Sequence, residues 1–216
     1  MTNQEFIDKI IAEYKKARNL IHTDGGYRIT RGLSHSISGS AEDLFALFIA
    51  QQLDDESLHF IVDKTTTIRF SRHKKSTSFR PDLMILKENV LTNYFDLKTD
   101  LGWKRDLSKY LEAKNTLIKN LIHKKNSDFW INWESKQTIK ASKDLKYQIV
   151  VLSGKNISEK QLAANIEKAA SLPYVEMYIL TDGQHLNYYH DNEAKLIKIK
   201  KEEFDRLKEH TKSMVG

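Results

Sequence analysis

The residues best suited to chemistry lie in one short stretch of the chain, from Arg80 to Lys98. Asp96 and Lys98 are two residues apart in an apolar segment rich in β-branched and aromatic residues, so a strand would present both side chains on one face. Asp82 opens the preceding apolar segment, and a turn at 87–89 would make the two strands adjacent and antiparallel. The pattern therefore predicts that two carboxylates and one ammonium meet at the edge of an apolar sheet.

Such a group suits the hydrolysis of a phosphodiester bond. Carboxylate oxygens are ligands of Mg²⁺, which usually keeps several waters and also binds substrate phosphate. The metal polarises a phosphoryl oxygen and lowers the pKa of a bound water. Lys98 would orient or deprotonate the attacking water and offset the charge that builds on phosphorus. We therefore expect Mg²⁺ as the cofactor, with Mn²⁺ as a substitute.

The arrangement of these residues resembles the motif of the PD-(D/E)xK nuclease superfamily, to which many type II restriction endonucleases belong. The matching residues are Pro81-Asp82 and, fourteen residues after the first aspartate, Asp96-Leu97-Lys98. The resemblance implies that Asp82 and Asp96 bind the metal, assisted by the backbone carbonyl of Leu97. It also implies that Lys98 is the catalytic lysine.

The superfamily often has a further acidic residue near the metal, on the first helix of its core. Glu42, at the start of a predicted helix over 41–53, is the candidate here, as a catalytic residue that binds the metal through a water. Its neighbour Asp43 is an alternative. The resemblance covers the core, about residues 40–152, in which the superfamily shows a helix, three strands, a helix and a strand.

The three-residue part of the motif has little specificity. An acidic residue also precedes a lysine by two positions at Glu13/Lys15, Glu112/Lys114, Glu134/Lys136, Asp144/Lys146 and Glu193/Lys195. In a lysine-rich chain such pairs are mostly solvated charges. Asp96 and Lys98 differ because they close an apolar strand and follow Pro81-Asp82 at a distance that suits a hairpin. The alternative is that Asp82 is a turn residue and that the other two form an exposed pair.

Basic residues flank the acids. The chain has 35 Lys and Arg against 29 Asp and Glu, a formal net charge of +6, which favours a polyanionic partner such as nucleic acid. Cations beside a carboxylate site would draw the phosphates of double-stranded DNA toward it, although a hydrated loop is the simpler interpretation of either cluster alone. The flanking candidates for DNA binding are Arg72, Lys74, Lys75, Arg80, Trp103, Lys104 and Arg105.

A long connection, residues 123–146, separates a predicted helix from a predicted strand. Connections of this length are usually functional or disordered, and we interpret this one as an inserted recognition loop. Its tryptophans would reach a groove or stack on a base, or they would pin the loop to the core. Base readout is expected from this segment, from 99–105 or from 24–38. The candidates for DNA binding within it are Lys124, Lys125, Trp130, Trp133, Lys136 and Lys140.

The composition excludes several other classes of protein. The chain has no cysteine, which rules out a disulfide framework and a thiolate zinc site and is compatible with a cytoplasmic location. Its eight histidines show no ligand spacing, and no phosphate-binding glycine loop is present, so we expect neither zinc nor a nucleotide cofactor. No apolar run approaches the ~20 residues that span a bilayer, so we expect no membrane association.

The periodicity of the 216 residues predicts one α/β domain over 1–216. Its architecture is expected to be a three-layer α/β/α sandwich with a central mixed β-sheet, and the resemblance implies a restriction-endonuclease-like core. Helices are predicted over 2–20, 41–53, 104–122, 156–171 and 202–210, and strands over 59–62, 65–70, 83–86, 90–97, 147–152 and 174–180, with a hairpin of 185–190 and 196–200.

These expectations combine into one hypothesis. The chain is a Mg²⁺-dependent DNA endonuclease, of the type II restriction class, that works as a homodimer so that two active sites cut the two strands. The dimer is implied by the resemblance. One alternative is a repair, recombination or phage-defence nuclease of the same fold. The other is a non-catalytic module that binds nucleic acid and in which the acids are incidental.

Overall fold

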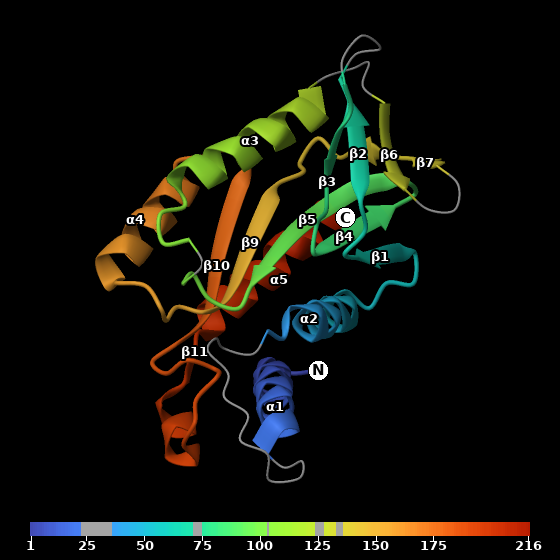
Figure 1. The fold of residues 1–216 in the computed structure, drawn as a ribbon. Coiled ribbons are helices and arrows are strands. Elements are labelled where there is room, and N and C mark those ends of the chain that lie inside the picture. The colour runs from blue at the N-terminus through green and yellow to red at the C-terminus, as the bar shows by residue number, and fades with distance from the viewer. Residues whose placement is uncertain (23–35, 71–74, 103, 124–127, 133–135) are drawn as a thin grey trace.

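A computed structural model describes residues 1–22, 36–70, 75–102, 104–123, 128–132 and 136–216 (Figure 1). The helices are α1 (Asn3–His22), α2 (Ser38–Leu53), α3 (Ser108–His123), α4 (Glu159–Ala170), the short 3₁₀ helix η1 (Asp191–Leu196) and α5 (Lys201–Val215). The strands of the large sheet are β1 (Leu58–Val62), β4 (Leu83–Lys87), β5 (Val90–Lys98), β8 (Lys140–Ala141), β9 (Tyr147–Ser153), β10 (Val175–Asp182) and β11 (Lys198–Ile199). The small sheet contains β2 (Thr66–Arg69), β3 (Thr77–Phe79), β6 (Asp128–Asn132) and β7 (Lys136–Thr138).

The large sheet is mixed, as expected. Its strand order is β1-β4-β5-β9-β10-β11, with β8 beside β5. The β1, β4 and β5 strands are antiparallel neighbours, whereas β5, β9 and β10 are parallel. Parallel strands require a crossover connection, and α3 and α4 lie in the two connections that join these strands. The predicted α/β class and the mixed sheet are confirmed.

The β4–β5 hairpin forms for local reasons. Both segments are apolar, and only two residues, Glu88 and Asn89, separate them. Both residues have positive φ angles, 49° and 64°, as a two-residue type I′ turn requires, and the twist of that turn matches the twist of paired strands. The turn sets the pairing of Lys87 with Val90 and of Leu86 with Leu91. An irregularity between Ile85 and Leu86 then shifts the pairing by one residue, so that Leu83 lies opposite Phe95 and Asp82 faces the end of β5.

The large sheet separates two apolar cores. The first contains Phe95 and Leu97 of β5 together with residues of α1, α2 and α5, and the second contains Tyr94 together with residues of α3, α4 and the small sheet. Figure 1 shows α3 and α4 beside β9 and β10, with α5 behind them. Because side chains alternate along a strand, Asp96 and Lys98 project on the side of Tyr94, toward α3.

The small sheet was not expected. The segment predicted as a strand over 65–70 pairs with β3 and β6 and does not join the large sheet. The described part of 123–146 contains β6 and β7 of this small sheet and β8 of the large sheet. The buried residues Ile68, Phe129 and Ile131 of the small sheet belong to the second core, so burial of apolar side chains holds this sheet in place.

The hairpin predicted for 185–190 and 196–200 is wrong. Residues 185–190 form no strand, and only Lys198–Ile199 pairs with β10. Side chains bind the backbone groups that the hairpin would have used: the Glu193 carboxylate accepts hydrogen bonds from the backbone N–H groups of Tyr189 and His190 at 3.0 Å each. Such local bonds compete with strand pairing. In the part of the chain that the structure describes, no helix is long and apolar enough to span a membrane.

Candidate active site

The end of β5 brings together the acidic and basic residues of the predicted motif. The backbone N–H of Asp82 donates to the carbonyl of Phe95 at 3.1 Å, which places Asp82 across from the last residues of β5. Its Oδ2 accepts a hydrogen bond from the backbone N–H of Leu97 at 2.6 Å and lies 3.2 Å from Nζ of Lys98. Asp82 and Lys98 therefore form an ion pair at this end of the hairpin.

A pocket of about 500 Å³ opens at these residues. The first turns of α2 form one wall, the end of β5 and the residues after it form another, and α3 contributes Tyr110. Phe45 of α2 packs edge-on against Phe95 of β5, with ring centroids 5.4 Å apart, which holds α2 against the sheet. The lining residues are Ser38, Ala41, Glu42, Asp82, Leu97, Lys98, Thr99, Asp100 and Tyr110.

Asp96 is buried and lies outside this lining. It is 3% exposed, and its Oδ2 accepts hydrogen bonds from the hydroxyls of Tyr110 at 2.5 Å and Tyr147 at 2.7 Å. Nζ of Lys114 lies 3.0 Å from the same oxygen. Burial would raise the pKa of Asp96, but the charges of Lys114 and Lys98 and the two hydrogen bonds outweigh it, so this pKa lies below its ordinary value. Asp96 is therefore an anion at neutral pH.

The surroundings of Glu42 in the pocket disfavour its ionised form. Burial raises the pKa of Glu42 to about 7, and the charges of Asp82 and Asp63 act in the same direction. Burial also raises the pKa of Asp82, against the opposing charge of Lys98. Of the two acids considered for this position, Glu42 lines the pocket, whereas Asp43 is exposed.

The donors at the site are those that a hard cation prefers. Among the described residues no three His, Asp or Glu side chains gather as a metal-binding group, so a site formed by protein side chains alone is not present there. Mg²⁺ needs fewer protein ligands because it keeps several waters. The carboxylates of Asp82 and Asp96, together with a backbone carbonyl at Leu97, fit that requirement. The raised pKa of Glu42 fits it too, because a cation would relieve the repulsion between these acids.

The candidates for DNA binding that the structure describes form two groups, one close in sequence to the pocket residues and one on or beside the small sheet. Arg80 lies two residues before Asp82, and its Nε is 2.8 Å from Oδ1 of Asp63. Lys104 and Arg105 are exposed, close in sequence to the pocket residue Asp100. The candidates Arg72, Lys74, Trp103, Lys124, Lys125 and Trp133 lie outside the described residues.

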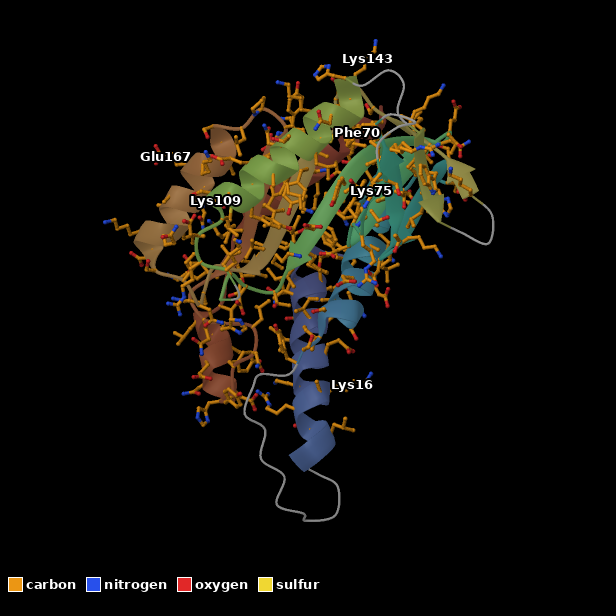
Figure 2. All side chains as sticks on the ribbon, turned by 45° about the horizontal axis from the view of Figure 1, so that its top comes forward. Lys16, Phe70, Lys75, Lys109, Lys143 and Glu167 are labelled. Atoms are coloured by element: carbon orange, nitrogen blue, oxygen red, sulfur yellow. The ribbon has the colours of Figure 1, made fainter. Side chains whose placement is uncertain are left out.

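The other candidates lie on or beside the small sheet, and the chain joins this sheet to the pocket residue Asp82. The chain enters β2 shortly after Asp63, whose backbone N–H donates to the carbonyl of Asp82 at 3.2 Å, and it returns from β3 through Arg80 to Asp82. Lys75, labelled in Figure 2, is exposed just before β3. Nζ of Lys136 lies 3.5 Å from the ring centroid of Trp130, and Lys140 is exposed at the start of β8.

Sequence reasoning missed the residues that surround Asp96. Lys114 belongs to one of the acid–lysine pairs interpreted as solvated, but its ammonium contacts Asp96, while Glu112 pairs with Lys168. Tyr110 and Lys114 are four residues apart on a predicted helix, and that spacing places them on one face. The four-residue spacing alone does not identify Tyr110 and Lys114 as partners of Asp96, because that also requires the position of the helix over the sheet.

The rival pair, Asp144 and Lys146, forms no comparable site. Asp144 is exposed, and Nζ of Lys146 lies 2.6 Å from Oε1 of Glu176. Comparison with known proteins adds no assignment, because no protein family model and no curated protein matches this chain.

Proposed function

We propose that this protein is a Mg²⁺-dependent endonuclease that hydrolyses phosphodiester bonds in double-stranded DNA. The observation that carries the proposal is the meeting of Asp82, Lys98 and the backbone of Leu97 beside a pocket of about 500 Å³, with Asp96 anchored directly behind them. A carboxylate and an ammonium at the pocket, with the anionic Asp96 buried behind them, are groups that this reaction uses.

The resemblance to the PD-(D/E)xK superfamily supports the same proposal. The motif residues lie at the end of a hairpin of the mixed sheet, and the order α2, β1, β4, β5, α3, β9 agrees with the order implied by the resemblance once the small sheet and β8 are set aside. On this proposal the large sheet and its helices are the three-layer core of a restriction-endonuclease-like domain.

Asp82, Asp96 and the backbone carbonyl of Leu97 would hold the metal, with Glu42 contributing through a water. When bound, Mg²⁺ polarises the phosphoryl oxygen and lowers the pKa of a water; Mn²⁺ would substitute. The chain's own residues supply the remaining functions. The Lys98 ammonium would orient the attacking water and offset charge on the phosphate. The Glu42 carboxyl, with its pKa raised to about 7, would hold or release a proton near neutral pH.

The basic residues around the pocket would contact the DNA backbone. Arg80 precedes the site and Lys104 and Arg105 follow it in sequence, whereas Lys75, Lys136 and Lys140 lie on or beside the small sheet. These cations would bind phosphates and make binding dependent on salt. The finer hypothesis is a type II restriction enzyme that acts in the cytoplasm as a homodimer, because a second active site is needed to cut the second strand.

Incubation of the purified protein with unmethylated phage DNA tests the proposal. We expect cleavage in Mg²⁺, no cleavage in EDTA, and loss of cleavage in Asp82→Asn, Asp96→Asn and Lys98→Met. The exposed Asp144 offers a matched control, since Asp144→Asn changes the acid of the rival pair and should leave cleavage unchanged.

The products separate the alternatives. Discrete fragments with sequence-defined ends indicate a restriction enzyme, whereas a ladder or cutting confined to branched substrates indicates a repair or defence nuclease. DNA binding that needs no divalent ion and is unaffected by Asp96→Ala, without cleavage, would contradict the proposal and favour a binding module.

A further inference from the structure

The ammonium of Lys114 lies in an enclosure of tyrosine rings beside Asp96. Its Nζ is 5.0 Å from the ring centroid of Tyr94, 5.3 Å from that of Tyr110 and 4.8 Å from that of Tyr147. We call these three rings the tyrosine cage. The Tyr94 hydroxyl also accepts a hydrogen bond from Nζ at 2.9 Å. The lysine comes from α3, and two of the rings come from β5 and β9.

Packing fixes the position of this ammonium. The rings of Tyr94 and Tyr147 are fully buried and meet edge-to-face at 5.4 Å, and those of Tyr110 and Tyr147 meet at 6.2 Å. The Lys114 side chain is 18% exposed. An ammonium removed from water is costly unless it is paired, and here the ring faces and one carboxylate supply the pairing. The lysine is therefore held in one place.

In the part of the chain that the structure describes, three polar side chains contact the Asp96 carboxylate, and all three do so at the same oxygen. Oδ2 accepts from the hydroxyls of Tyr110 and Tyr147 and lies 3.0 Å from Nζ of Lys114. Three donors on Oδ2 fill its capacity as an acceptor and prevent rotation of the carboxylate. A metal held by Asp96 would therefore use Oδ1.

We infer that Lys114 is a positioning residue for metal binding: with the tyrosine cage it fixes Oδ2 of Asp96 so that Oδ1 serves as the ligand. The inference rests on the proposed function, because it assumes that a divalent ion binds at Asp82 and Asp96. Groups that orient a metal ligand from behind typically change metal affinity or activity about 10- to 100-fold when they are removed.

Titration of the protein with Mn²⁺ tests the inference without DNA. Electron paramagnetic resonance detects the free ion and so gives the dissociation constant. In Lys114→Met the dissociation constant for Mn²⁺ should rise at least about tenfold. The Mg²⁺ concentration for half-maximal DNA cleavage should rise as well, while DNA affinity in EDTA should be unchanged. Lys119→Met is the matched control, because Lys119 is an exposed lysine on the same helix, and it should leave the Mn²⁺ affinity unchanged.

A second variant covers the case in which Lys114→Met does not fold. Tyr147→Phe keeps the ring of the cage and removes only the hydroxyl that donates to Oδ2 at 2.7 Å. The loss of one hydrogen bond to a charged group should raise the Mn²⁺ dissociation constant about tenfold. Circular dichroism would verify that each variant is folded.

The outcomes separate the inference from the proposed function. If the wild-type protein cleaves DNA in Mg²⁺ but every folded variant binds Mn²⁺ as tightly as the wild type, the inference is wrong and the proposed function stands. If the wild-type protein neither binds Mn²⁺ nor cleaves DNA, the proposed function fails and the inference fails with it.

Discussion

Glu42 offers a prediction in which stability and activity change in opposite directions. Burial and the negative charges of Asp82 and Asp63 raise the pKa of Glu42 from its ordinary 4.5 to about 7. The folded protein is therefore destabilised whenever this carboxyl is ionised. Glu42→Gln removes the charge and keeps the shape of the side chain, so it should stabilise the fold while it impairs DNA cleavage.

The magnitude follows from the pKa. For a fully buried group, a rise from 4.5 to about 7 corresponds to about 3 kcal/mol. Glu42 is partly exposed, and screening by solvent reduces this to about 1 kcal/mol. The folded state binds the proton more tightly than the unfolded chain, so wild-type stability should fall as pH rises from 4.5 to about 7. Below that range both states carry the proton, and Glu42→Gln should have no effect.

Urea unfolding in EDTA measures this difference. At about pH 8 the free energy of unfolding of Glu42→Gln should exceed that of the wild type by about 1 kcal/mol, and at about pH 4 the two should agree. Asp43→Asn, at the exposed neighbouring position, should change stability by less than about 0.5 kcal/mol at either pH. Equal or lower stability of Glu42→Gln at about pH 8, or the same gain at about pH 4, would show that ionised Glu42 does not destabilise the fold.

Three further predictions concern charges at and around the pocket. Lys98→Met should lower kcat for plasmid cleavage by about 100-fold or more and leave DNA affinity in EDTA unchanged; retained cleavage would remove Lys98 from the mechanism. Burial would raise the pKa of Asp100, but hydrogen bonds, the one from His185 first, hold this pKa below its ordinary value, so the stability they contribute is present at neutral pH and lost as pH falls through the folded-state pKa. Asp100→Asn should therefore lower the free energy of unfolding at neutral pH by about 1 kcal/mol and make this free energy depend less on pH in the acid range, as measured by urea titrations. An unchanged free energy would show that the hydrogen bond to His185 contributes no stability. Lys136→Ala should weaken DNA binding and reduce the slope of log affinity against log salt by about 1 if Lys136 contacts a phosphate, whereas an unchanged slope would exclude that contact.

The hairpin and its charged residues were predictable because the signals are local. Alternation along β5 and a two-residue turn predict that Asp82 and Lys98 lie close together, and the structure places Nζ and Oδ2 at 3.2 Å. The register shift between Ile85 and Leu86, which moves the pairing at this end by one residue, was not predicted. The apolar segment of β9 and the crossover helix α3 follow from patterns of similar length. In each case the information lies within about 20 residues.

The surroundings of Asp96 were not predictable, because they depend on residues far apart in the sequence. Tyr147 is 51 positions from Asp96, and no pattern in either segment indicates that contact. The same holds for the small sheet, in which β2 pairs with β6 from beyond α3. The β-branched and aromatic residues of 65–70 predicted a strand, but this composition does not specify which strand it joins.

Local side-chain chemistry accounts for the element that was wrongly predicted. The apolar residues of 185–190 and 196–200 favour a hairpin. The Glu193 carboxylate instead accepts hydrogen bonds from the backbone N–H groups of Tyr189 and His190, which competes with strand pairing. The spacing of apolar residues carries no information about a carboxylate that accepts hydrogen bonds from nearby backbone N–H groups, so it could not predict this exception.

The position of a bound divalent ion is the sharpest test of the proposed metal site. Crystals grown with Mn²⁺ would show it by anomalous scattering. We expect a peak at the pocket, about 2.1 Å from carboxylate oxygens of Asp82 and Asp96, the latter Oδ1, and from the carbonyl oxygen of Leu97. If the pocket showed no peak at high Mn²⁺ concentration and Lys98 remained ion-paired with Asp82, the proposed metal site would be wrong.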